Sequence, residues 1–128
     1  MNKNEIYLTR RERFSAAHKL ENQNISNKEN EKTFGKCLNL HGHNYVLFVT
    51  VKGEPKEKDG FVCDLKKLSS VLKKYIINKL DHQFINEVDF MKGKIASTEN
   101  LCISIWRELE RKIKSELHCQ LHCVKIYE

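Results

Sequence analysis

A histidine pair in the first half of the chain has a spacing that suits metal binding. His41 and His43 are separated by one residue, at the start of a segment rich in Val, Tyr, Phe and Thr that is typical of a β-strand. Side chains two residues apart on a strand point to the same face, so both imidazoles can reach one ion. Gly42 between them has no side chain to crowd the opposite face.

A third histidine can complete this site. His18 ends an earlier predicted strand, and antiparallel pairing of the two strands would bring it opposite the other two histidines. Three histidines without a fourth protein ligand are typical of catalytic zinc, which keeps one position open for water or substrate. A His-x-His pair taken alone is equally compatible with ordinary core or surface histidines.

Three further residues could supply acid–base chemistry beside such a metal. Cys37 lies four residues before His41 and could be a fourth zinc ligand, a nucleophile or a proton-transferring thiol, although a single loop cysteine is more often inert. Asp81 and His82 follow a predicted helix and could orient and tune a thiol, as the relay of a hydrolase triad does. They are also typical of an ordinary polar helix end.

Residues 118–123 form a rival metal-binding pattern, with His118, Cys119, His122 and Cys123. On a helix, the pairs four residues apart would share a face and could hold zinc. On a strand, the two pairs would point to opposite faces and give two poor half-sites. Because residues 121–127 look extended, we expect no metal there.

The elements that position these residues begin with three predicted strands. Alternating or β-branched patterns predict strands over residues 6–17, 43–54 and 121–127. Residues 21–32 are polar and rich in Asn, and they are interpreted as a loop. Residues 56–60 are interpreted as a polar turn.

Two helices are predicted between the second and third strands. The first should begin after Asp64, a good N-cap residue, and present an apolar side as far as Lys79. The second should begin near Ser97 or Thr98, with an apolar stripe over residues 101–117. The order β-β-α-α-β indicates an α+β fold with an antiparallel sheet.

The second strand is apolar on both faces. Four residues share one face, and they are Tyr45, Leu47, Val49 and Val51. Val46 and Phe48 lie on the other face. Because two helices can cover only one face of a small sheet, we expect other copies of the chain to cover the second, and therefore a homo-oligomer.

The composition indicates one ordinary globular domain spanning residues 1–128. The chain has 23 Lys+Arg against 17 Asp+Glu, a net charge of +6, with 40% hydrophobic and 31% charged residues, which argues against disorder. No apolar run approaches the roughly 18 residues of a membrane span, and the N-terminus lacks the apolar segment of a secretory signal. We therefore expect a cytoplasmic protein with no membrane partner.

The charged residues and cysteines narrow the classes of partner. Basic residues are scattered, without a basic helix or an aromatic platform interleaved with Lys and Arg, so nucleic acid is not expected. On charge alone, the excess positive charge is compatible with nucleic acid, with a phosphorylated metabolite or simply with solubility. Five cysteines in a reducing compartment are more typical of buried thiols, metal ligands or a nucleophile than of disulfides.

Taken together, six segments resemble the 6-pyruvoyl-tetrahydropterin synthase family in their order and spacing, from about Arg10 to Glu128. They are FSAAH (14–18), FGKC (34–37), HGHNY (41–45), LDH (80–82), STEN (97–100) and VKIYE (124–128). The resemblance implies the tunnelling fold, in which three antiparallel sheets join into a trimeric barrel with helices outside, and two trimers stack into a hexamer.

The resemblance also implies residue roles. By motif position, the zinc ligands are His18, His41 and His43. Cys37 is the implied catalytic proton acceptor, with Asp81 and His82 as its relay across a subunit interface. Glu128 is implied to be both a pterin anchor and a relay member. Thr98 and Glu99 fall at the family's second pterin-contacting stretch.

The activity implied by the resemblance is that of a zinc-dependent lyase acting on 7,8-dihydroneopterin triphosphate, a small pterin substrate, to give 6-pyruvoyl-tetrahydropterin and triphosphate. The interval between Cys37 and His41 is three residues long, and this length instead resembles that of relatives that make 6-carboxytetrahydropterin for queuosine. The loop over residues 24–34, by contrast, resembles the biopterin branch. The 6-carboxytetrahydropterin product is thus an alternative. A pterin-binding module without activity is a non-enzyme alternative, which the retained Cys37, Asp81 and His82 argue against.

Overall fold

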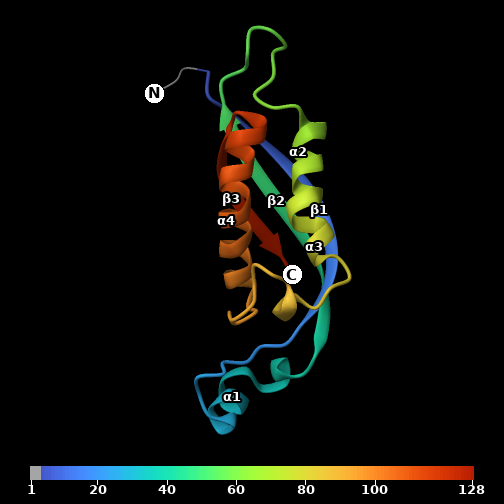
Figure 1. Ribbon diagram of the computed structural model, residues 1–128, viewed down its shortest axis with the longest axis vertical. Helices are drawn as coiled ribbons and strands as arrows, with labels where there is room; N and C mark the ends of the chain where they lie inside the picture. The colour runs from blue at the N-terminus through green and yellow to red at the C-terminus, as the bar shows by residue number, and fades with distance from the viewer. Residues whose placement is uncertain (1–3) are drawn as a thin grey trace.

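The computed structural model describes residues 4–128, in which a three-stranded antiparallel sheet is covered on one face by helices (Figure 1). The strands are β1 (Ile6–His18), β2 (His41–Gly53) and β3 (Gln120–Tyr127), and β2 lies in the middle, antiparallel to both neighbours. The predicted α+β class and the antiparallel sheet are confirmed. The strand bounds differ from those predicted by one or two residues.

The helix-facing side of the sheet forms the core. The four β2 residues predicted for this face, Tyr45, Leu47, Val49 and Val51, are all buried. Against them packs α4 (Thr98–Leu117), whose apolar stripe is completely buried as predicted and consists of Leu101, Ile105, Leu109, Ile113 and Leu117. The buried face of β2, which repeats every second residue, therefore packs against the buried stripe of α4, which repeats every 3.6 residues.

The first predicted helix is a rod of three segments beside α4 (Figure 1). It consists of α2 (Leu65–Leu72), a π-helical turn over residues 73–77 and α3 (Asn78–Leu80). The side chain of Asp64 accepts the Lys66 N–H at 2.9 Å, which confirms the predicted N-cap. A π-turn inserts one extra residue into the helical repeat, and here the consecutive residues Ile76 and Ile77 are both buried.

One segment predicted as a loop contains a helix. Within residues 21–32 and just beyond them, α1 (Asn27–Phe34) forms past the end of the sheet, apart from the other helices (Figure 1). Its cap is Ser26, whose hydroxyl accepts the Glu29 N–H at 3.1 Å. The prediction was wrong because α1 has no apolar stripe, and its one buried residue is the polar Asn30. The spacing of Ser26 and Glu29, which is that of a capping box, could have indicated the start of this helix.

Among residues 4–128, no helix lies over the opposite face of the sheet (Figure 1). Val46 and Phe48 are only half-buried there, and Tyr127, paired with Val46 across β2 and β3, is 58% exposed. The rings of Phe48 and Tyr127 meet edge to face, with centroids 5.5 Å apart. As predicted, apolar side chains lie on both faces of β2.

Among the helices of residues 4–128, none combines the length and the apolar character that a membrane crossing requires.

Candidate metal centre and active site

Three histidines converge where β1 ends and β2 begins. His18 lies opposite His41 in the strand register, and His43 lies opposite Ala16. The His18 ring centroid is 4.6 Å from that of His41 and 5.1 Å from that of His43, and one nitrogen of each ring lies within 4.8 Å of the others. The pairing predicted from sequence therefore places all three imidazoles around one point.

Gly42 allows the two strands to approach closely beside these rings. A Cβ atom at this position would lie 3.2 Å from the carbonyl oxygen of Ala16 on β1. Contacts this short require the neighbouring backbone to shift, so a side chain at residue 42 would disturb the strand pair that carries the histidines.

Backbone carbonyl groups select the tautomer of two of these rings. His18 Nδ1 lies 2.8 Å from the carbonyl oxygen of Ala96, and His41 Nδ1 lies 2.7 Å from that of Asn39. Because a carbonyl can only accept, each Nδ1 carries a hydrogen, and in the neutral ring Nε2 then has the lone pair. The sequence did not predict these two carbonyl partners, because every residue type has a main-chain carbonyl group.

The resulting donor set fits a metal ion. His18 is 3% exposed, and burial is the main cause that lowers its pKa, which favours the neutral ligand form. The Nε2 atoms of His18 and His43 are buried without a hydrogen-bond partner within the described chain. Buried nitrogen atoms normally have partners, and imidazole nitrogens are preferred ligands of zinc and related divalent ions.

Glu128 approaches this centre from the end of β3. One of its carboxylate oxygens is 2.7 Å from His43 Nε2 and 3.7 Å from His18 Nε2. The 2.7 Å contact is not a hydrogen bond, because a hydrogen on His43 Nε2 would not point at that oxygen. The other oxygen accepts a hydrogen bond from the Thr98 hydroxyl at 3.2 Å. Glu99, predicted beside Thr98, lies exposed in the first turn of α4.

Tyr45 is a member of this site that sequence reasoning placed only in the core. Its ring centroid is 5.6 Å from that of His43 and 6.3 Å from that of His18. The side chain is 1% exposed and its hydroxyl has no hydrogen-bond partner within residues 4–128. Burial, together with the Glu128 carboxylate, raises the pKa of Tyr45, so the hydroxyl remains a hydrogen-bond donor. Tyr45 lies two residues after His43 on the same strand face, and this spacing could have indicated that it belongs to the site.

Asp81 and His82 lie at the outer edge of β1. Asp81 accepts the Ser15 N–H at 2.9 Å, and its second oxygen is 3.0 Å from His82 Nδ1. The Ser15 N–H is the main cause that lowers the pKa of Asp81. His82 has a left-handed backbone, with φ of 60°, and a side chain that is 82% exposed. A shallow cavity of about 490 Å³ is lined by both His82 and His43.

Cys37 lies in a short 3₁₀ turn, Gly35–Leu38, just before β2. Its carbonyl accepts the Leu20 N–H at 2.8 Å, which ties this turn to the chain after His18. No hydrogen bond among residues 4–128 joins the thiol to Asp81 or His82. One copy of the chain therefore brings the three histidines together, but does not bring the predicted relay to the thiol.

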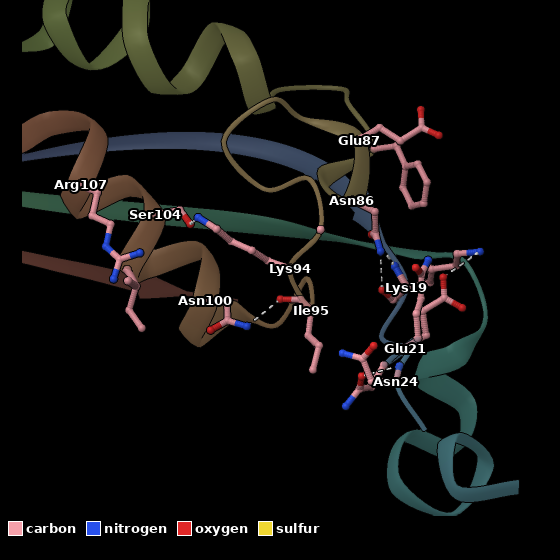
Figure 2. A pocket seen from close by; sticks show the side chains of 15 residues that line it. Lys19, Glu21, Asn24, Asn86, Glu87, Lys94, Ile95, Asn100, Ser104 and Arg107 are labelled. Atoms are coloured by element: carbon pink, nitrogen blue, oxygen red, sulfur yellow. Dashed lines mark hydrogen bonds and ion pairs between the residues drawn. The ribbon is translucent and has the colours of Figure 1, made fainter. Parts of the chain in front are cut away.

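A cavity of about 790 Å³ lies between the first turns of α4 and the chain that follows β1. Its lining includes Lys19, the residue after His18, and Ile95, the residue before Ala96. Figure 2 shows Lys94 extending to Ser104 on α4, where its ammonium group donates to the Ser104 hydroxyl at 2.9 Å, with Arg107 further along the helix. Lys19, Lys94 and Arg107 give the cavity positive charge, which Glu21 and Glu87 offset in part.

The rival pattern at residues 118–123 does not form a metal site. His118 ends α4 in a left-handed conformation, and the following residues alternate along β3. Among residues 4–128, the only group of three or more potential ligands close enough to share an ion is His18, His41 and His43.

Comparison with known proteins agrees with this architecture. The family described as 6-pyruvoyl tetrahydropterin synthase matches residues 7–128. A "6-pyruvoyl tetrahydrobiopterin synthase" of Dictyostelium discoideum is 45% identical over 114 residues, covering 88% of this chain and 84% of the relative. A "6-carboxy-5,6,7,8-tetrahydropterin synthase" of Aquifex aeolicus is 38% identical over 82 residues, covering 60% of this chain and 50% of the relative.

The fold is likewise that of a solved relative. The structure of Caenorhabditis elegans 6-pyruvoyl tetrahydropterin synthase superimposes with a TM-score of 0.86 at 36% identity, covering 97% of this chain and 89% of that one. The chain belongs to the 6-pyruvoyl tetrahydropterin synthase family, a family of lyases.

Proposed function

We propose that this chain is a zinc-dependent carbon–oxygen lyase that converts 7,8-dihydroneopterin triphosphate to 6-pyruvoyl-tetrahydropterin and triphosphate. The observation that carries the proposal is the group of His18, His41 and His43 at the paired strand ends, in which two buried Nε2 atoms make no hydrogen bond within residues 4–128. Membership of the family connects this group to pterin chemistry.

The three histidines would hold the ion through their ring nitrogens. The Ala96 and Asn39 carbonyls orient the His18 and His41 rings and keep hydrogen on Nδ1. A bound zinc ion would supply Lewis-acid polarisation of the substrate side chain. The three-histidine set leaves room for a substrate group, as catalytic zinc sites do.

Proton movement is assigned to Cys37, Asp81 and His82. A thiolate near a cation is a suitable proton acceptor, and the 3.0 Å contact of Asp81 with His82 Nδ1 would hold that imidazole in one orientation. Because the relay lies exposed at the sheet edge, we assign the Asp81–His82 pair of one subunit to the Cys37 of a neighbouring subunit.

Recognition of the pterin ring is assigned to Glu128, supported by Thr98 and Glu99. A carboxylate can accept two N–H hydrogen bonds from the amide-like edge of a pterin, which gives both affinity and orientation. The hydroxyl of Thr98 holds one oxygen of Glu128 in place. Glu99 lies in the same helical turn as Thr98, where it could contact a bound ring.

The triphosphate end is assigned to the cavity between α4 and the chain after β1. Lys19, Lys94 and Arg107 line this cavity, and Lys19 follows His18 directly in the sequence (Figure 2). Charge-assisted hydrogen bonds from such side chains are the usual means of holding phosphate groups. This assignment uses part of the excess positive charge of the chain.

The active assembly is proposed to be a trimer or a hexamer. Within residues 4–128 of one copy, no helix covers the sheet face with Val46, Phe48 and Tyr127 (Figure 1), and no hydrogen bond joins Asp81 or His82 to the Cys37 thiol. A neighbouring subunit would supply both the cover and the relay. Light scattering combined with activity should show trimers or hexamers and inactive isolated subunits. A fully active monomer would contradict both arguments.

The remaining assignments are a single domain over residues 1–128, a cytoplasmic location, and a small-molecule partner with neither nucleic acid nor membrane. The family match over residues 7–128 supports the single domain. The scattered basic residues support a small anionic substrate.

Incubation of the zinc-loaded protein with 7,8-dihydroneopterin triphosphate, followed by mass analysis of the pterin, tests the proposal. We expect 6-pyruvoyl-tetrahydropterin and one triphosphate per turnover. Formation of 6-carboxytetrahydropterin instead would establish the alternative that the Aquifex aeolicus relative suggests. Binding of substrate without any product would contradict both and favour the pterin-binding module.

A further inference from the structure

A pair of cysteines lies at the other end of the sheet from the histidines. Cys63 immediately precedes Asp64, the cap of α2, and Cys119 lies between the end of α4 and the start of β3. Gln120, next to Cys119, pairs with Lys52. At about 3.3 Å per residue along β2, this point is roughly 35 Å from His41, so the pair is separate from the metal centre.

The two cysteines lie beside each other. Each side chain shifts the pKa of the other, and the Cys63 thiol donates to the carbonyl oxygen of Asp64 at 3.4 Å. Val62, which precedes Cys63, and Cys119 both lie next to Gly53, since a Cβ atom there would lie 3.2 Å from Val62 Cγ1 and 3.9 Å from the Cys119 Cβ. Glycine at residue 53 thus leaves space beside the two cysteines.

The surroundings of the two sulfur atoms differ. Cys63 is 5% exposed. Cys119 lines a cavity of about 870 Å³ with Lys114 and His118, so small molecules can reach it. The Cys63 side chain, with help from Lys56, lowers the pKa of Cys119, and the Cys119 side chain raises the pKa of Cys63. The Lys56 ammonium group is held close by, where it donates to the carbonyl of Val62 at 3.1 Å. A thiolate is the reactive form of cysteine.

We infer that Cys63 and Cys119 form a peroxide-sensitive dithiol site, in which the accessible Cys119 reacts first and the buried Cys63 resolves the product as an intramolecular disulfide. Neither cysteine belongs to the proposed lyase site, and the inference does not depend on the lyase activity.

The chemistry balances with hydrogen peroxide as the oxidant. The Cys119 thiolate attacks one peroxide oxygen, the O–O bond breaks, and Cys119 becomes a sulfenic acid while hydroxide leaves. The Cys63 sulfur then attacks the Cys119 sulfur, and the sulfenic hydroxyl leaves as water with the Cys63 proton. The hydroxide takes up the proton that Cys119 lost earlier. Two thiols are oxidised to one disulfide, and peroxide is reduced to two waters.

The disulfide would tie the start of α2 to the end of α4. Both helices cover the same sheet face, so the cross-link would join elements that are already side by side (Figure 1). Cross-links that close long loops stabilise a fold by restricting the unfolded chain. The oxidised protein is therefore expected to melt at a higher temperature than the reduced protein.

A second cysteine pair provides a matched control. Cys123 lies near enough to Cys102 to help raise the pKa of the Cys102 thiol, although burial is the main cause of that rise. The Cys102 thiol donates to the carbonyl of Val124 at 3.5 Å, as the Cys63 thiol does to that of Asp64. A raised pKa leaves less of the reactive thiolate on Cys102, so this pair is expected to oxidise more slowly.

The test is peptide mapping by mass spectrometry, without reduction, after titrating the folded protein with hydrogen peroxide. We expect a Cys63–Cys119 cross-linked peptide at lower peroxide than any Cys102–Cys123 product. In Cys63→Ser, dimedone should label Cys119 as a trapped sulfenic acid, whereas in Cys119→Ser it should leave Cys63 unlabelled. A double Cys102→Ser, Cys123→Ser variant should cross-link as the parent does.

Mapping of the unmodified chain keeps the inference testable even if Cys63→Ser fails to fold. A Cys102–Cys123 disulfide forming first, or peroxide consumption with the Cys63 and Cys119 thiols still free, would overturn it. Faster labelling of Cys63 than of Cys119 by iodoacetamide in the folded, reduced protein would also overturn the assigned order of reaction.

Discussion

His18 lies directly opposite His41 at the last paired position of β1 and β2, with ring centroids 4.6 Å apart. Strand register therefore sets the metal centre, because residues on neighbouring strands meet at fixed positions. A slip of one residue would turn His18 to the other face of the sheet. The residues that maintain this register are as important to the centre as the histidines are.

Gly42 is the first of these residues. Gly42→Ala would place a Cβ atom 3.2 Å from the Ala16 carbonyl oxygen, between the two strands that carry the histidines. We expect weaker zinc binding, and a loss of stability of about 1–3 kcal/mol, which is typical of overpacking. Zinc content after dialysis and thermal unfolding would measure the two effects.

Gly53→Ala is the matched control at the other end of β2. Its Cβ atom would also come within 3.2 Å of a neighbour, but that neighbour is the side chain of Val62. Zinc binding should therefore remain normal. Equal loss of zinc in both variants would indicate a general loss of fold, and would contradict a specific role for Gly42.

Glu128 is expected to act on the pterin and not on the metal. Its carboxylate approaches two of the three histidines, whereas the mutually close group contains only His18, His41 and His43. Glu128→Gln should weaken pterin binding about tenfold or more, since it removes a charge-assisted acceptor. Zinc content should stay normal, and loss of zinc in this variant would make Glu128 a ligand.

Asp81→Asn should lower turnover about a hundredfold or more, while zinc and pterin binding stay intact. The amide keeps the shape of Asp81 but loses the charge that holds His82 Nδ1 at 3.0 Å. Steady-state kinetics with metal analysis would test this. Unchanged turnover would remove Asp81 from the relay.

Asp81 also has a predictable effect on stability. Because the Ser15 N–H lowers its folded pKa, the charged form is favoured in the folded state. Its contribution is complete above the unfolded value of about 3.9 and is lost as the pH falls through the lower folded pKa. The stability difference between the parent and Asp81→Asn should thus be constant near neutral pH and shrink in acid. A difference that grows in acid would contradict the assignment.

Arg107→Glu tests the assignment of the charged cavity to triphosphate. Reversal of this charge should raise the KM for the triphosphate substrate about tenfold or more, with little effect on binding of the dephosphorylated pterin. Arg111→Glu, one turn further along α4 and outside the cavity lining, is the matched control. Equal effects of the two variants would reflect overall charge only.

Much of the fold could be predicted from residue patterns. The alternation in β2 and the stripe of α4 specified buried faces, and antiparallel pairing then placed His18 opposite His41. By contrast, α1 was missed because a polar helix beyond the sheet needs no apolar stripe. The π-turn was missed because one extra residue hardly disturbs a pattern of buried positions.

The site was predictable where side-chain type decides the chemistry. The histidine spacing indicated the metal ligands, but the Ala96 and Asn39 carbonyls that orient them depend on main-chain geometry. Tyr45 was recognised as a core residue, while its unpaired hydroxyl depends on what surrounds it. The route from Asp81 and His82 to Cys37 depends on assembly, which residue spacing in one chain does not specify.

Zinc content measured alongside turnover in Cys37→Ala and His41→Ala tests the central claim most directly. If the histidines hold the metal and the thiol moves protons, Cys37→Ala should keep zinc and pterin binding while turnover falls by about 10²–10⁴. His41→Ala should lose the metal and the activity together, because one of three ligands is removed. Loss of zinc from Cys37→Ala as readily as from His41→Ala would make Cys37 a ligand of a closed structural site, and would contradict the proposed lyase mechanism.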